Sequence, residues 1–147
     1  MTKPKPIPEG VSTVTPHLFI KDSSRAIDFY KKAFGAEELN RIPAPDGKGV
    51  IHAVVRIGNA PVFIADPFGP QPLETKSSLF VFVENVDELF ARAVRAGCQV
   101  AMPLDNMFWG DRYGIVTDPY GNQWQLATHV EDVSPEEMAR RMKNARF

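Results

Sequence analysis

Two histidines and a glutamine have side chains that can bind or transform a small organic molecule. His17, His52 and Gln125 each lie in a segment whose residue pattern is typical of a strand. An imidazole titrates near neutral pH and can act as a general base, and a carboxamide both donates and accepts hydrogen bonds. His17 and His52 are therefore candidate catalytic residues, and Gln125 is a candidate ligand-binding residue. Alternatively, the imidazoles only line a partly polar pocket, or they hold a divalent metal, for which two histidines and an amide are a poor set without a carboxylate.

A second candidate group is aromatic and surrounds a glycine. Phe108, Trp109 and Tyr113 follow one another closely, and aromatic faces bind planar ligands well. We interpret all three as candidate ligand-binding residues, with the alternative that Trp109 belongs to the core. Arg112 either anchors an anionic group of the ligand or forms a local ion pair with Asp111.

The first half of the chain predicts the elements that would position the histidines. We expect a helix that begins at Asp22 or Ser23, with the side chain of that residue as its N-cap. The helix should end at Gly35, because glycine readily adopts the left-handed backbone conformation found at helix ends. The strands that we expect around it span 14–21, 36–42, 50–57 and 61–66. On the third of these strands, the apolar set expected beneath the helix is Ile51, Ala53, Val55 and Ile57. The set expected on the opposite face, which His17 and Thr15 would share, is Val50, His52, Val54 and Arg56.

The second half repeats this order after a proline-rich linker at 67–76. We expect a helix over 86–96, a loop over 107–112, and strands over 78–83, 98–102, 113–117 and 123–128. Trp124 should pack beneath the helix, and His129 should be a surface residue. Cys98 has no neighbouring cation to activate it, so we assign it no role.

Glycines mark the same places in both halves. Gly35 and Gly97 end the two helices 62 positions apart, and Gly58 and Gly121 turn the two final hairpins 63 positions apart. A repeat of this length is typical of a duplicated supersecondary unit. The sequence therefore predicts an α+β fold of two βαβββ modules, residues 12–66 and 77–129, whose curved mixed sheets enclose a cavity.

The two ends lie outside the repeat. Residues 1–11 hold three prolines and two lysines without the apolar segment of a signal peptide, and predict a flexible leader. Residues 130–147 contain a capping box at Ser134, with proline at the first helical position, and predict a short basic helix to about Asn144. We expect this helix to pack on the body or on a partner subunit.

Composition narrows the class of protein. The 147 residues carry a formal net charge of −1 with dispersed basic residues, so nucleic acid and membrane are not expected partners. A lone cysteine fits a reducing compartment, and we expect a cytoplasmic protein.

Several motifs together resemble the vicinal-oxygen-chelate superfamily of glyoxalases, bleomycin-resistance proteins and dioxygenases. The opening VTPHL and the helix AIDFYKKAFGA look like the first strand and helix of that family. WGDRYG resembles the loop into its seventh strand, and TDPYGNQWQL resembles its last hairpin. The likeness covers about residues 12–142, is closest to the PhnB-like branch, and implies a homodimer with a small-molecule ligand.

The metal-binding positions of that family are altered in this sequence. In its metal-dependent members, one position on each of the first, fourth, fifth and eighth strands supplies His, Glu or Gln. These positions fall on Thr15, one of 62–64, Ser78 and Gln125, of which only Gln125 is an acceptable ligand. The resemblance therefore implies no cofactor, and counts against glyoxalase I and extradiol dioxygenase activity; a divalent metal would need a non-standard site.

Three hypotheses of function follow. The first is a metal-independent binder of a small aromatic or polar molecule, either a sequestering resistance-type protein or a carrier. The second is a lyase, isomerase or dioxygenase-type enzyme that uses His17 and His52 as base or as ligands of a non-standard metal. The third is a structural protein whose cavity is vestigial.

Overall fold

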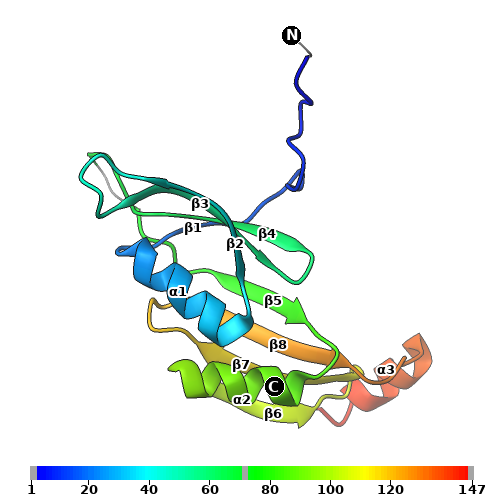
Figure 1. The fold of residues 1–147 in the computed structure, drawn as a ribbon. Helices are drawn as coiled ribbons and strands as arrows, with labels where there is room; N and C mark the ends of the chain where they lie inside the picture. The colour runs from blue at the N-terminus through cyan, green and yellow to red at the C-terminus, as the bar shows by residue number, and fades with distance from the viewer. Residues whose placement is uncertain (1–2, 71–72, 146–147) are drawn as a thin grey trace. The chain divides into compact units, whose positions relative to one another are not determined.

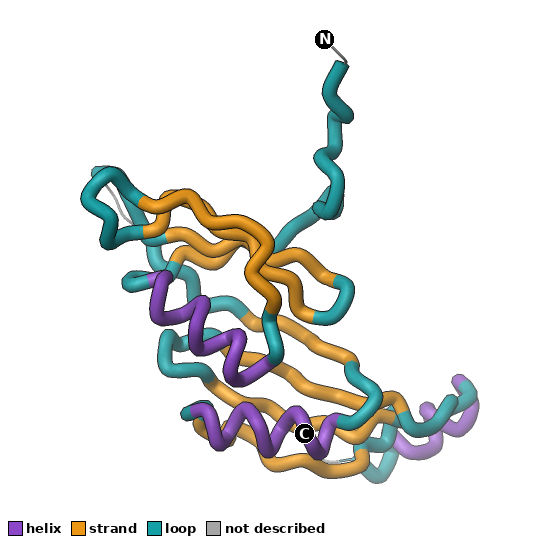
Figure 2. Tube along the Cα trace, in the orientation of Figure 1, coloured by secondary structure: helices purple, strands orange, loops and turns teal. Residues whose placement is uncertain are grey.

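The computed structural model describes residues 3–70 and 73–145. The chain forms two compact units, residues 1–75 and 76–147, and the boundary falls within the proline-rich segment (Figures 1 and 2). Within the described ranges, no helix has the length and apolar character needed to cross a bilayer.

Unit 1 is a mixed four-stranded sheet with one helix. The strands stand in the order β1-β4-β3-β2, with β1 parallel to β4 and the other neighbours antiparallel. The bounds are β1 His17–Phe19, α1 Ser23–Phe34, β2 Glu37–Pro43, β3 Val50–Ile57 and β4 Ala60–Ala65.

Helix α1 covers one face of this sheet because its apolar residues recur at helical spacing. Gly35 ends the helix as expected, with φ of 68° and its N–H donating to the carbonyl oxygen of Lys31 at 3.1 Å. The helix residues that are buried are Ser23, Ala26, Ile27, Tyr30, Ala33 and Phe34. The sheet residues buried beneath the helix are Leu18, Ala53, Val55, Val62 and Ile64.

The start of α1 is capped by a residue distant in sequence, which corrects the expectation that Asp22 or Ser23 caps it. Asp22 makes no side-chain capping hydrogen bond. Instead, Asp66 Oδ1 accepts from the backbone N–H of Asp22 at 2.8 Å and of Ser23 at 3.4 Å. Asp66 Oδ2 accepts from Val50 N–H at 2.7 Å, so one carboxylate joins the helix start to two strands.

Unit 2 repeats the arrangement. Its strands stand in the order β5-β8-β7-β6, with β5 parallel to β8. The bounds are β5 Ser78–Phe82, α2 Val86–Ala96, β6 Gln99–Asn106, β7 Asp111–Thr117 and β8 Gln123–His129, followed by α3 Pro135–Met142. The fold is therefore the predicted α+β duplication, and Ser134 is confirmed as the N-cap of α3, since its Oγ accepts from Glu137 N–H at 3.1 Å. The Glu137 carboxylate binds Arg140 and Arg141.

Three strands differ from the prediction by two or more residues at a boundary. Strand β1 is shorter because Pro16 has no N–H to donate, although its carbonyl oxygen accepts from Phe63 at 2.9 Å. Strand β6 runs on to Asn106 through two register shifts, which break the alternation that would reveal it. Strand β7 begins at Asp111, inside the expected loop.

Ile51 does not pack beneath α1, which corrects its place in the expected apolar set. Ile42 pairs with His52 and Pro43 pairs with Val50, so Ile51 is the extra residue of a bulge and is 44% exposed. Val50 takes the buried position. Beyond the bulge, Ala53 and Val55 are buried as expected.

Trp124 lies in the core of unit 2 under α2, as predicted. Its side chain is 1% exposed, and its Nε1 donates to Asp118 Oδ2 at 2.9 Å. Cys98 is also buried, and burial, followed by the charge of Asp118, raises the pKa of its thiol to about 12.

We predict that Trp124→Ala lowers the free energy of unfolding by about 3–5 kcal/mol, because it removes a large core aromatic side chain. Trp109→Ala, at a half-buried loop position, is the matched control and should cost less. Urea denaturation of both variants measures the difference, and equal losses would contradict this placement of Trp124.

Candidate functional site

Each sheet has a second face that its own helix does not cover. In unit 1 this open face carries two imidazoles and two phenylalanines. His17 and Phe63 are direct partners in the β1–β4 register, and Val54 of β3 pairs with Phe63 on its other side. We call the set His17, Phe19, His52 and Phe63 the unit 1 open face.

The rings of this face contact one another. His17 stacks on Phe19 with centroids 4.2 Å apart, and meets His52 edge-on at 5.8 Å. Phe63 lies 4.6 Å from His52. The structure thus brings the two predicted histidines together, as the strand alternation required.

His17 is electrostatically unusual. Its Nε2 is buried and has no hydrogen-bond partner among the residues described. Burial, followed by the charge of His52, lowers the pKa of His17 below its ordinary 6.5. Its imidazole is therefore neutral near pH 7, and a neutral ring nitrogen can accept a proton or a hydrogen bond.

The open face of unit 2 combines aromatic rings with an oriented amide. Tyr113 stacks on Phe80 at 5.7 Å, and Phe82 lies 4.7 Å from Phe80. The Tyr113 hydroxyl donates to Gln125 Oε1 at 2.6 Å, while Gln125 Nε2 donates to Ser78 Oγ at 2.8 Å. These five residues are the unit 2 open face.

The repeat relates the two open faces position by position. His17 pairs with Phe63 in β1–β4, as Phe80 pairs with Gln125 in β5–β8. Of the three fourth-strand candidates for a metal position, this register selects Phe63, because Val62 and Ile64 are buried on the helix side.

The side chains at the four family positions do not suit a metal. Phe63 has no donor atom, and both ends of the Gln125 amide are taken by Tyr113 and Ser78. Thr15 donates its hydroxyl to Ser12 O at 3.0 Å. Across residues 3–70 and 73–145, no group of three His, Cys, Asp or Glu side chains is placed to hold an ion.

Trp109 borders the unit 2 open face on a fixed loop. Its ring lies 5.4 Å from Tyr113 and 5.1 Å from Phe108. Its Nε1 donates to Asp111 Oδ2 at 2.9 Å, and Met107 N–H donates to Asp111 O at 2.7 Å. The three predicted aromatics therefore do form a cluster.

Arg112 does not pair with Asp111, which corrects that expectation. Its guanidinium binds Asp87 at the start of α2, with Nη2 to Oδ1 at 2.9 Å and Nε to Oδ2 at 2.9 Å. This pairing lowers the pKa of Asp87 and raises that of Arg112. Arg112 alternates with Tyr113 along β7, so it points away from the open face.

Sequence reasoning missed Phe19, Phe80, Phe82 and the carboxylate partners of His129, and it named Phe63 only as one of three alternatives for a metal position. Phe19, Phe63, Phe80 and Phe82 could have been found, because each shares its strand face or its register with a predicted residue. His129 is half exposed, as expected of a surface residue, but it binds two carboxylates.

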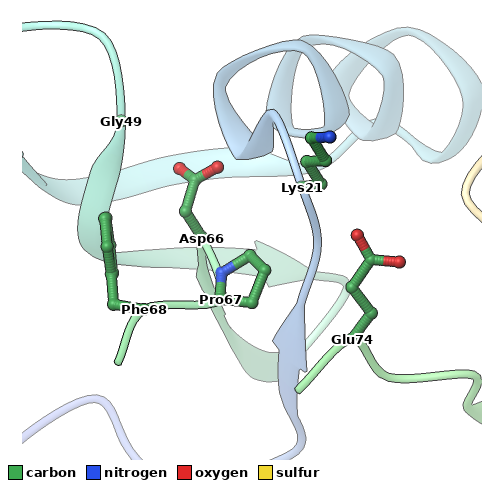
Figure 3. A pocket seen from close by; sticks show the side chains of 6 residues that line it. All are labelled: Lys21, Gly49, Asp66, Pro67, Phe68 and Glu74. Atoms are coloured by element: carbon green, nitrogen blue, oxygen red, sulfur yellow. The ribbon is translucent and has the colours of Figure 1, made fainter. Parts of the chain in front are cut away.

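A separate surface pocket of about 540 Å³ lies at the strand ends of unit 1 (Figure 3). None of the predicted site residues lines it. One of its two carboxylates, Asp66, accepts from three backbone N–H groups. The lining residues are Lys21, Gly49, Asp66, Pro67, Phe68 and Glu74.

Comparisons with known proteins agree with this fold. Residues 11–126 match the family described as the Glyoxalase/Bleomycin resistance protein/Dioxygenase superfamily. An uncharacterized protein of Mycobacterium bovis is 41% identical over an alignment of 142 positions, and the match covers 89% of this chain and 92% of the relative.

Two solved structures are also similar. TioX from Micromonospora sp. ML1 has 30% identity and a TM-score of 0.69, and the match covers 81% of this chain and 99% of TioX. TnmS3, an antibiotic binding protein from Streptomyces sp. CB03234, has 25% identity and a TM-score of 0.61, with 81% and 97% covered.

We predict that His17 titrates below 6.5 and that His52→Ala raises its pKa, because one of the two causes of the shift is removed. Since the unfolded chain binds this proton more readily, the contribution of His17 lowers the free energy of unfolding as pH falls below about 6.5. NMR titration of the ring protons measures the pKa. His17→Phe should remove the loss of stability, and an unchanged loss in that variant would contradict the assignment.

Proposed function

We propose that this chain, which belongs to the Glyoxalase/Bleomycin resistance protein/Dioxygenase superfamily, binds a planar aromatic or conjugated organic molecule with polar substituents, without a metal. In each unit, the rings of the open face stack on such a molecule. The imidazoles orient its polar groups on the unit 1 open face, and the Gln125 amide orients them on the unit 2 open face. The protein acts as a sequestering binder or carrier.

The observation that carries this proposal is the aromatic character of the unit 2 open face. Phe80 is 45% exposed and Phe82 is 61% exposed, although both lie on a strand within a sheet. Exposed aromatic surface beside fixed polar groups is typical of ligand-binding sites. Tyr113 and Ser78 hold Gln125 in one orientation, so the amide is preorganised.

The absence of metal ligands supports a binder over the metal-dependent activities of the family. The first-, fourth- and fifth-strand positions carry Thr15, Phe63 and Ser78 in place of His, Glu or Gln. No step through a metal is therefore proposed. The description of TnmS3 as an antibiotic binding protein supports a non-catalytic role in a protein of this fold.

Membership of the PhnB-like branch is part of the same proposal. The helix AIDFYKKAFGA and the hairpin TDPYGNQWQL support it, and in the structure they form α1 and the β7–β8 turn. We also propose a cytoplasmic location, which the lone buried Cys98 supports.

A second candidate function is proton abstraction from a bound carbonyl or phenol compound. The unpartnered Nε2 of His17, on a ring whose pKa is lowered, supports this role. His52 lies edge-on to it, with the ring centroids 5.8 Å apart. Stoichiometric Zn, Ni, Mn or Fe after purification without chelators would instead favour a non-standard metal site.

We predict that a panel of planar aromatic compounds contains members that raise the melting temperature, since a ligand at 100 times its dissociation constant stabilises by about 2.7 kcal/mol. His17→Ala and His52→Ala should weaken this binding by about tenfold, and they should change the free energy of unfolding less than the free energy of binding. Thermal shift and calorimetry measure both quantities. Trp124→Phe, a core variant, is the control that should lower stability and retain affinity. Unchanged affinity in the His17 and His52 variants would contradict the assignment of these histidines to the binding site.

We predict a homodimer in solution, in which α3 and the proline-rich segment are proposed contact elements. Multi-angle light scattering at micromolar concentration should give about twice the monomer mass of 16.4 kDa. A species of monomer mass alone would refute the proposal.

A further inference from the structure

We infer that His129 is a positioning residue for Trp109, and that the cluster Asp111, His129 and Asp132 makes this positioning dependent on a proton. The inference rests on the proposed function, because Trp109 borders the unit 2 open face. It assigns a role to an imidazole outside the five residues of the unit 2 open face, where His129 pairs with Asp111 in the β7–β8 register.

The cluster is a continuous chain of hydrogen bonds. His129 Nδ1 lies 2.8 Å from Asp111 Oδ1, and His129 Nε2 lies 2.7 Å from Asp132 Oδ1. Asp111 is 6% exposed, and its other oxygen accepts from Trp109 Nε1 at 2.9 Å. The buried carboxylate therefore has the histidine on one oxygen and the indole on the other.

The proton count decides how this chain behaves. Both ring nitrogens of His129 face carboxylates, and only the imidazolium can donate from both. A neutral ring donates from one nitrogen and presents a lone pair to the other carboxylate. Loss of the proton thus breaks one hydrogen bond and removes the positive charge opposite the buried Asp111.

The hydrogen bonds around the His129 ring favour its charged form. The hydrogen bonds of Asp132, then of Asp111, raise the pKa of His129 above its ordinary 6.5. The neighbouring Glu131 is paired with Arg141 of α3 at 2.6 Å. The paired imidazolium is fully present below pH 6.5, and it is lost as pH rises through the raised folded-state value.

The Trp109 loop is built against the same C-terminal segment. Gly110 O accepts from the backbone N–H groups of Val130 at 2.9 Å and of Glu131 at 3.1 Å. Gly110 has φ of 104°, and a Cβ there would collide with Glu131 O. Arg141 Nη1 donates to Phe108 O at 3.0 Å. With this backbone held, the Asp111–His129 pair controls the indole itself.

Tyr113 connects the Trp109 ring to the unit 2 open face. The Trp109 ring meets Tyr113 edge-on at 5.4 Å, and Tyr113 stacks on Phe80 and donates to Gln125. An Asp111 carboxylate that loses the positive charge on its other oxygen holds the indole less firmly, and the indole then supports the Tyr113 ring less firmly. Binding of an aromatic molecule should accordingly weaken as pH rises past the pKa of His129.

The first experiment needs no ligand. Tryptophan fluorescence is titrated from about pH 5.5 to 9, and the ring protons of His129 are titrated by NMR over the same range. We expect a fluorescence transition at the pKa of His129, above 6.5, that is absent in Trp109→Phe and in His129→Gln. Asp132→Asn should move it to lower pH, because it removes the largest cause of the raised pKa. A transition that persists in His129→Gln, or a flat Trp109 signal while His129 titrates, would overturn the inference.

The second experiment uses a neutral planar fluorophore, 6-propionyl-2-dimethylaminonaphthalene, as the probe. Its affinity should fall by about two- to fivefold from pH 6 to 9 in the natural chain, as expected for loss of a half-exposed ion pair. His129→Gln should show no such fall. If the probe and the wider aromatic panel fail to bind at any pH, the proposed function fails, while the Trp109 titration still decides the positioning role. An equal fall in both proteins would contradict the link to the open face.

Discussion

In each unit the helix is fixed by a side chain at the end of the fourth strand, and the rest of the architecture depends on this tie. In unit 1 the Asp66 carboxylate receives backbone N–H groups from the start of α1 and from β3. In unit 2, at the equivalent position 62 residues later, Thr128 Oγ1 accepts from Val86 N–H and donates to Val83 O, each at 2.8 Å. A helix start leaves its first N–H groups unsatisfied, so a strand residue that accepts from them also sets where the helix lies.

Because the helix covers one face of each sheet, the residues on the other face do not have to pack in the core beneath it. The helix-side residues of β3 and β4 are small and aliphatic, as a dry core requires. The alternate residues are freed from that demand, and in both units they include rings: His17, Phe19, His52 and Phe63 in one, Phe80, Phe82 and Tyr113 in the other. In both units, one face of the sheet therefore packs against the helix and the other face carries rings, although the side chains on the two open faces differ.

Local periodicity was enough to predict the order of the elements and the shared face of His17 and His52, because alternation is a property of each strand by itself. It failed where a non-local partner decides. Ile51 is displaced by a bulge against β2, the cap Asp66 is 44 residues from Asp22, and Arg112 finds Asp87 rather than its neighbour Asp111. His129 seemed an ordinary strand-end residue, since its two carboxylate partners are set by the β7–β8 register and the chain beyond it.

Because Cys98 is buried, the rate at which its thiol is modified can report local opening of unit 2. A thiol with a pKa of about 12 is almost wholly protonated at neutral pH, and only the thiolate reacts with alkylating reagents. Modification must therefore wait until the structure around Cys98 opens. Its rate then reports how often this part of the unit opens, with no second cysteine in the chain to confuse the reading.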